Sequence, residues 1–490
     1  MRTSDCGQGR QGRTSRRAQG AGTPRVARLH PDDAKAGVSA NVEAVAGDRA
    51  PGQGPSQRLS RPVRRKRPTI KRVVKHHLCT GCGTCAGICP HDALTMVVSR
   101  KEGQYIPRLD KRNCTQCGLC LDACPGHSVD FEGLSRAIMG DIPEDIALGK
   151  YLCSYVGHAT DEDVRYSGAS GGMVTALLVC ALERGLIDGA LVTRMRPGKP
   201  LEAKPFIARS KEEIMVAARS KYCPVPASAA VSKILASEGR FAVVGLPCHI
   251  QGIRKAEQYL PKLRERIRYR ISITCSINYS FQGTEKLLRS LKIPPQSVET
   301  LEYRGRGWPG SMYIRQDDGD ETLIPLKDYY KKLSPYSLRR CTLCSDMLGE
   351  LSDLSCGDAW VPDVMKDDKV GSSFVLTRTP DGEELLEAAA ADECVEVSDL
   401  DPRDLATSQS RAVFKKRKLS ARMALFRWTG KRVPKYRQRL LPPIAGDYRD
   451  MIKFYVARYA LSGNRPILRR LFQAARLLKR NKRDKNSSPA

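Results

Sequence analysis

Residues 79–90 read CTGCGTCAGICP, and residues 114–125 read CTQCGLCLDACP. Each stretch is one C-x2-C-x2-C-x3-C-P run, so this part of the chain repeats itself. The spacing is typical of proteins in which three thiolates of one run bind an iron–sulfur cube and the fourth binds the other cube. The repeated stretch therefore predicts two [4Fe-4S] clusters.

The predicted ligand sets follow from the exchange of the fourth cysteine between the runs. We assign the first cluster to Cys79, Cys82, Cys85 and Cys124. We assign the second cluster to Cys89, Cys114, Cys117 and Cys120. Structural zinc or disulfides are the alternatives, but zinc sites take four ligands in pairs and do not require the x3-C-P endings. We expect a redox protein.

Length and cysteine usage indicate the class and compartment. A chain of 490 residues with 41% hydrophobic content has room for about two to four domains. Its 18 cysteines lie mostly in metal-type spacings without a secretory apolar region before them, which favours a reducing cytoplasm. No apolar stretch is long enough to span a bilayer. We expect a cytoplasmic protein, at most peripheral to a membrane.

The net charge of +30 lies in the two ends of the chain. Residues 1–78 carry a balance of +13 and residues 401–490 a balance of +20, whereas residues 79–400 carry −3. Nucleic-acid binding would rest on these ends alone, and such binding would weaken steeply with salt. The charge therefore describes the ends and not the redox centre.

The expected fold class is α+β. A ferredoxin-like two-cluster domain precedes an α/β-type flavin and iron–sulfur domain, between a disordered N-terminal leader and a helical, basic C-terminal extension. The leader is expected because residues 1–66 are rich in Gly, Arg, Ala and Ser without a helical or strand period, although a true start near residue 72 is an alternative. The expected boundaries are 1–69, 70–134, 135–400 and 401–490.

Within the cluster domain we expect short strands at 74–78, 94–98, 105–109 and 128–131, and we interpret 135–166 as a mixed connector. Next comes a Ser/Gly-rich loop at 167–172. Apolar residues that recur three and four positions apart follow it, and they predict a helix. Such a loop at a helix N-terminus suits a nucleotide phosphate, although similar loops also cap helices for purely structural reasons.

Two further cysteines follow predicted strands. Cys248 ends the apolar run FAVVGLPC and Cys275 ends RYRISITC, where open α/β sheets place ligands. With the C-x2-C pair Cys341 and Cys344 they suggest a third four-thiolate site. The loop YRGRGWPGSM (303–312) either binds a phosphate or carboxylate through its two arginines, Arg304 and Arg306, or is a Gly-rich surface turn.

The C-terminal extension contains PILRRLFQAARLLKR at 466–480, a predicted basic amphipathic helix. Such a helix lies on an anionic membrane, docks an acidic partner, or packs its apolar face on its own domain.

Several of these motifs resemble the coenzyme F420 hydrogenase/dehydrogenase beta-subunit family, here with a fused N-terminal two-cluster ferredoxin domain. They are SGASGGMVTALL, SKYCPVP, VVGLPCHIQGIRK, the cysteine after ISIT, YRGRGWPG and RRCTLCSDMLGELSDLSCGDAW. Together they cover about residues 165–360, or 75–400 with the cluster domain. The basic extension has no role that the resemblance transfers.

The resemblance implies FAD beside a third [4Fe-4S] cluster. The cysteines that match the family's ligands are Cys248, Cys275, Cys341 and Cys344, and Cys356 is left out because relatives can carry a hydroxyl residue there. The residues that match flavin-associated segments are Ser170, Gly171, Gly172 and Thr175, with Ser220, Lys221 and Tyr222. No catalytic residue is named. His249 and Lys255 flank Cys248 and either tune a redox potential or are structural.

The activity implied by the resemblance is hydride exchange between reduced coenzyme F420 and FAD. FAD exchanges both hydrides and single electrons, so the electrons would then pass through the clusters to ferredoxin or a partner enzyme. A ferredoxin-dependent reductase of an unidentified organic metabolite is one alternative. A non-catalytic electron-relay subunit is another.

Overall fold

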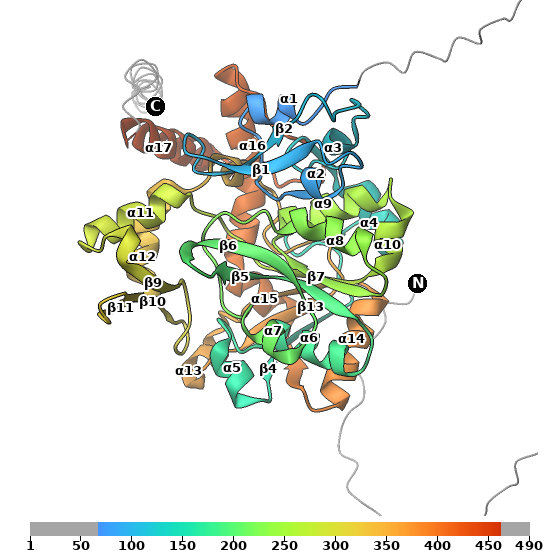
Figure 1. The fold of residues 1–490 in the computed structure, drawn as a ribbon, viewed down its shortest axis with the longest axis vertical. Helices are drawn as coiled ribbons and strands as arrows, with labels where there is room; N and C mark the ends of the chain where they lie inside the picture. Colours follow the sequence, from blue (N-terminus) through green and yellow to red (C-terminus); the bar gives the residue numbers. More distant parts are fainter. Residues whose placement is uncertain (1–66, 462–490) are drawn as a thin grey trace, which may run out of the picture. The chain divides into compact units, whose positions relative to one another are not determined.

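The computed structural model describes residues 67–461. The expected leader, up to residue 66, and the expected amphipathic helix at 466–480 lie outside the described residues. Within them, the predicted mixture of helices and strands is confirmed, with a ferredoxin-type segment before an α/β sheet (Figure 1). The boundaries expected at 134/135 and 400/401 stay predictions.

An eight-stranded sheet forms the centre of the larger part. Its order is β14-β4-β13-β12-β8-β7-β5-β6, and the four adjacent strands β12, β8, β7 and β5 run parallel. The remaining pairs are antiparallel. In sheet order the strands are Val395–Asp399, Cys153–Ala159, Ser373–Thr377, Leu354–Asp358, Ile267–Ile273, Phe241–Gly245, Gly189–Arg196 and Lys199–Ala208.

Helices cover the two faces of this sheet, which is why the parallel strands are apolar on both sides. One core contains residues of α6 (Met173–Glu183) and α14 (Pro380–Ala391), with α5 (Glu162–Ser167) and α7 (Lys211–Met215) beside them. The other contains residues of α8 (Val231–Ala236), α9 (Pro247–Glu257) and α10 (Pro261–Arg266). Figure 1 shows these two groups on opposite sides of β5 and β7.

A smaller antiparallel sheet follows β8 in the chain. It has the order β11-β10-β9, from Glu321–Pro325, Ser311–Gln316 and Val298–Glu302. Its core also takes in α11 (Phe281–Ser290) and α12 (Leu326–Leu333), around the buried Tyr303, Met312 and Tyr329. The loop between β9 and β10 is the Gly-rich stretch 303–310, and the 3-10 helix η4 (Arg339–Leu343) comes after the smaller sheet.

The cluster segment consists of short elements around the two cysteine runs. They are α1 (Lys71–Lys75), α2 (Thr84–Gly87), β1 (Leu94–Ser99), β2 (Gln104–Leu109), α3 (Leu119–Asp122), β3 (Ser128–Asp130) and α4 (Phe131–Met139). Three of the four expected strands are present. The strand expected at 74–78 is wrong, because its first two residues belong to α1, where Val73 and the N-cap residue Ile70 lie about one helical turn apart and are both buried.

The mixed connector expected at 135–166 also needs a correction. It contains β4, which pairs with both β13 and β14 inside the large sheet. The strand was missed because CSYVGHA has a single large aliphatic residue, Val156, and no clean alternation of apolar and polar residues. Its partners lie more than 200 residues later in the sequence.

The C-terminal segment packs on the rest of the chain. It comprises α15 (Pro402–Ser408), α16 (Ser410–Trp428), β15 (Lys435–Arg437) and α17 (Ala445–Leu461). Leu419, Met423 and Phe426 of α16 share a core with Ile70 and Val73 of the cluster segment. Strand β15 pairs in parallel with β3. Within residues 67–461, no helix has the length and apolarity needed to cross a bilayer.

Candidate metal centres and cofactor cavity

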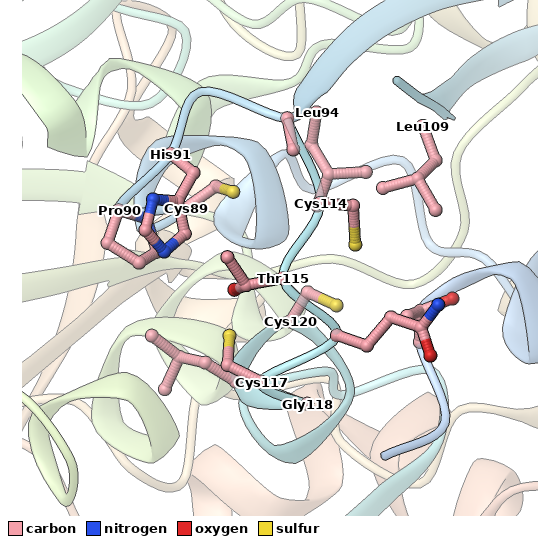
Figure 2. A pocket seen from close by; sticks show the side chains of 14 residues that line it. Cys89, Pro90, His91, Leu94, Leu109, Cys114, Thr115, Cys117, Gly118 and Cys120 are labelled. Carbon is pink, nitrogen blue, oxygen red and sulfur yellow. The ribbon is translucent and has the colours of Figure 1, made fainter. Parts of the chain in front are cut away.

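The second predicted cysteine set lines one small cavity near the surface. Figure 2 shows Cys89, Cys114, Cys117 and Cys120 around it, with Leu94 and Leu109 on its apolar side. Cys89 comes from the first run and the other three come from the second, which is the predicted exchange. Cys117 is exposed. The guanidinium of Arg67 donates a hydrogen bond of 3.3 Å to the carbonyl of Cys117.

The first set, Cys79, Cys82, Cys85 and Cys124, is buried throughout. Burial, followed by the thiols of Cys82, Cys79 and Cys124, raises the pKa of Cys85 well above its ordinary value, so the four thiols are electrostatic neighbours. Burial raises the pKa of Cys124 to about 11, although the ammonium of Lys255 opposes this rise. Four thiolates in this interior therefore require compensating positive charge.

The third set is brought together from distant parts of the chain. Cys248 lies in the first turn of α9, Cys275 follows β8, and Cys341 and Cys344 lie in and directly after η4. All four line one cavity. Burial, followed by the thiol of Cys82, raises the pKa of Cys248, which makes the first and third sets neighbours. Cys356, which we left out of the set, is buried in β12 within the sheet core.

The cavity of the third set has the lining that a cubane cluster would need. A cubane takes its four thiolates from around a small void, and four cysteines line each of two small cavities here.

Two buried cations face the third cavity beside a single carboxylate. Arg340 and Lys415 line it together with Asp346. The guanidinium of Arg340 donates to the carbonyls of Leu343 and Pro125, and to the hydroxyl of Tyr436. Buried cations that contact only neutral acceptors call for a nearby anion. A four-thiolate cluster held by these cysteines would supply that anion, so the residues present fit the group.

Helix α9 links the third set to the first. A Cβ atom at Gly252 would lie 2.3 Å from Oγ1 of Thr84 in α2, so only glycine permits this approach. The ammonium of Lys255 donates to the carbonyls of Cys124 (3.0 Å) and Ser128, so it contacts the first set rather than the third. His249 accepts the N–H of Leu246 at 3.1 Å. Burial lowers the pKa of His249 to about 4, and its neutral ring caps the start of α9.

A large cavity of about 1060 Å³ adjoins the third set. Of the seven expected flavin-associated residues, Ser170, Ser220, Lys221 and Tyr222 line it, whereas Gly171, Gly172 and Thr175 do not. Gly171 instead packs against Gly371, where a Cβ atom would lie 2.5 Å from the carbonyl oxygen, and Thr175 is buried in α6. The Ser/Gly-rich loop therefore reaches the cavity through Ser170.

Lys221 holds its own loop together. Its Nζ donates to the carbonyls of Ala217, Ala218 and Arg219 at 2.5, 2.5 and 2.9 Å. Burial lowers the pKa of Lys221 to about 7. The side chain thus fixes the turn that carries Ser220 and Tyr222 into the cavity wall.

The two arginines of the Gly-rich loop have different roles. Both nitrogens at the end of Arg304 donate to the carboxylate of Asp358, and its Nε donates to the carbonyl of Pro309 at 2.8 Å. Trp308 donates to the same carboxylate at 2.9 Å, and its ring lies 4.7 Å from that of Trp360. Arg304 therefore shapes the loop, whereas Arg306 is partly exposed at the cavity wall.

The lining of the large cavity favours an anionic aromatic ligand. Six basic side chains line it against one carboxylate, Asp358, among the described residues. They are Lys221, Arg304, Arg306, Lys327, Lys369 and Arg411. Trp308, Trp360, Tyr222 and Tyr330 add flat apolar surface. A dinucleotide with an isoalloxazine ring has this combination of charge and shape, so the residues present fit FAD.

Sequence reasoning missed part of this wall. Asp358 and Trp360 belong to the quoted motif CGDAW but were given no role, and the contact of Asp358 with Arg304 spans 54 residues. Gln409 and Arg411, at the start of α16, also line the cavity. Nothing in their local pattern signals a cavity wall.

The two cavities share Leu246, Cys275, Ile277 and Asn278. Strands β7, β8 and β12 end at this junction, so three adjacent parallel strands bring Cys248, Cys275 and Asp358 to one edge of the sheet.

Comparison with known families agrees with this arrangement. Two segments match the coenzyme F420 hydrogenase/dehydrogenase beta-subunit family: residues 154–232 match its N-terminal part, and residues 238–403 match its C-terminal part. Residues 78–127 match the "4Fe-4S dicluster domain" family.

Individual relatives cover most of the same segment. The coenzyme F420 hydrogenase beta subunit of Methanothermobacter thermautotrophicus is 30% identical over 252 residues, which is 50% of this chain and 83% of the relative. The corresponding subunit of Methanosarcina barkeri is 29% identical over 255 residues, 51% and 82% of the two chains. The coenzyme F420-dependent sulfite reductase of Methanocaldococcus jannaschii is 25% identical over 375 residues, 74% of this chain and 54% of the relative.

A solved structure of the F420-reducing [NiFe] hydrogenase complex from Methanosarcina barkeri, in a xenon derivative, contains a chain that is 26% identical. The match has a TM-score of 0.46 and covers 58% of this chain and 96% of that chain. The family matches and the relatives together show that this protein is an oxidoreductase of the coenzyme F420 hydrogenase/dehydrogenase beta-subunit family with a 4Fe-4S dicluster domain.

Proposed function

We propose that this chain is an iron–sulfur flavoprotein that exchanges hydride with coenzyme F420 and passes electrons singly to ferredoxin or a partner enzyme. FAD in the large cavity would supply the exchange between hydrides and single electrons, and three [4Fe-4S] clusters would carry the electrons. The residues that would hold the clusters are the three four-cysteine sets described above. Ser170, Ser220, Lys221 and Tyr222 would contact the flavin.

The observation that carries the proposal is that the large cavity and the three cysteine sets lie next to one another in a series. Cys275 lies in the wall of both the large cavity and the third cysteine set. Cys248 of the third set neighbours Cys82 of the first set. Cys85 of the first set neighbours Cys120 of the second, where Cys117 is exposed. Occupied in this way, the sites would form a path from the ligand cavity to the surface.

The protein's own residues would prepare this path in two ways. Burial of the first set would exclude water, protect its sulfurs and strengthen the local electrostatics, whereas the cysteines of the third set are partly buried. The cations around the large cavity would orient an anionic ligand, and the loop of Arg304 and Trp308 would hold one aromatic face of it. No side chain is required as an acid or base in a hydride transfer, so we assign no catalytic residue.

The test is to mix the anaerobically reconstituted full chain with reduced coenzyme F420 and follow flavin absorbance and cluster signals. We expect about twelve irons per chain, rapid flavin bleaching and then cluster reduction. A chain with about eight irons and an intact flavin would contradict the third cluster. Absence of bleaching, together with reduction by ferredoxin, would favour the ferredoxin-dependent reductase instead.

A further inference from the structure

Lys415 brings a charge from the C-terminal segment into the third cysteine set. It lies on α16, beyond the family-matched residues, which end at 403. Its Nζ donates to the carbonyl of Cys275 at 3.2 Å and to that of Asp346 at 3.4 Å. Its side chain lines the cavity with the four cysteines and is only 9% exposed.

The partners of Lys415 set it apart from its neighbours on α16. Lys416 pairs with Glu350 at 2.8 Å, and Lys418 pairs with Asp450 at 3.1 Å. Among the side chains that the structure describes, none of the ion pairs within 4.0 Å involves Lys415, although Lys416, Arg417 and Lys418 each form one. Neutral carbonyls hold the ammonium in position. The carboxylate of Asp346 also lines the cavity, but it accepts hydrogen bonds from Gln251 and from the N–H groups of Gly349 and Glu350, so the charge of Lys415 still acts on the cavity.

The position of Lys415 in the fold explains why its charge can act on the third cysteine set. The side chain is buried beside Cys275, and the ordered carbonyls keep the ammonium at a fixed site. An electron that enters a four-thiolate cluster adds negative charge to a site that is already anionic. A fixed cation nearby stabilises the reduced form more than the oxidised form, and low exposure limits screening by solvent and salt.

We propose that Lys415 raises the reduction potential of the third four-cysteine site, so that the C-terminal segment is a working part of the redox centre. This inference rests on the proposed third cluster. It gives the segment a function that does not depend on contact with a membrane or a nucleic acid.

The experiment compares Lys415→Met, Lys415→Gln and Lys415→Arg with the unsubstituted full chain after anaerobic reconstitution. Lys418→Met is the matched control, because it removes a cation three residues along the same helix. Iron content is measured first, and each cluster potential is then followed by electron paramagnetic resonance during a redox titration. We expect one of the three potentials to fall in Lys415→Met and Lys415→Gln, to recover in Lys415→Arg, and to stay unchanged in Lys418→Met.

Three results would overturn the inference. Unchanged potentials in Lys415→Met would show that the charge has no effect on the site. An equal shift in Lys418→Met would show a general effect of helix charge. Loss of about four irons in both Lys415→Met and Lys415→Gln would assign the residue to cluster assembly instead. About eight irons in the unsubstituted chain would instead contradict the proposed third cluster, so the two failures are distinguishable.

Discussion

Replacing Asp358 with asparagine removes the carboxylate that holds the 303–310 loop against the large cavity. The change keeps the side-chain shape but leaves the guanidinium of Arg304 without its charged partner. The side chain of Arg304 is 4% exposed and that of Asp358 is 17% exposed, so solvent replaces little of the interaction. Although burial lowers the pKa of Arg304, Asp358 raises it above its ordinary value, which agrees with a tightly bound ion pair.

The expected magnitude follows from this burial. Removing one partner of a buried ion pair costs about 3–5 kcal/mol, and the partly exposed carboxylate favours the lower end. The loop can lower this cost by moving Arg304 toward water, and flavin binding must then restore the original loop. A cost of about 3 kcal/mol corresponds to a loss of roughly 150-fold in flavin affinity.

The assay is equilibrium flavin binding to the iron-loaded chain, with the iron content measured in parallel. Asp320→Asn is the control, because Asp320 is exposed in the turn between β10 and β11. A double-mutant cycle with Arg304→Met should show that the two changes together cost no more than either alone. Unchanged flavin affinity in Asp358→Asn, or an equal loss in Asp320→Asn, would refute the loop argument.

Three further changes test other parts of the site. Cys341→Ser should lose about four irons and leave the spectrum of the ferredoxin-type clusters intact; persistence of every cluster signal would exclude Cys341 as a ligand. His249 has a folded pKa of about 4, so the unfolded chain binds more protons below pH 6.5. The unfolding free energy should therefore fall by up to about 3 kcal/mol between pH 6.5 and pH 4, and His249→Gln, measured by urea unfolding at several pH values, should flatten this slope. An unchanged slope would contradict the buried neutral ring. Arg112 is exposed two residues before Cys114, so Arg112→Glu should slow electron exchange with an acidic ferredoxin, most strongly at low salt. Stopped-flow rates that are equal at low and high salt would count against docking at this face.

Short-range patterns predicted much of the fold. The two cysteine runs specify their own loops, and the structure places the members of each predicted four-cysteine set together. The run FAVVG predicted β7 because it is apolar throughout, and its carboxyl end lies at the cavity junction. Whether these sets bind clusters stays a prediction. The sequence predicted these features because the residues that determine each loop or strand lie within a few positions of one another.

Contacts between distant residues could not be predicted in this way. Lys255 was expected either to tune a redox potential beside Cys248 or to be structural. It lies about two helical turns beyond Cys248 on α9, and its ammonium donates to the carbonyl of Cys124. The arginines of the 303–312 loop were expected either to bind a ligand or to belong to a Gly-rich surface turn, whereas Asp358 holds Arg304 in the wall of the cavity. Lys415 had no local signal at all, because its partners are carbonyls that lie 140 and 69 residues earlier.

A cation that is held in place by hydrogen bonds lies beside each of the three cysteine sets. These cations differ in their exposure to solvent. Arg67, Lys255 and Lys415 each donate to the carbonyl of one cysteine, in the second, first and third sets respectively. The side chain of Arg67 is 56% exposed and also pairs with Asp122, so salt and water screen its charge. Lys255 and Lys415 are buried and act in a medium that screens them little. We therefore expect the electrostatic environment of the first and third sets to change little with ionic strength. The environment of the second set, which an external carrier would reach, should respond to ionic strength.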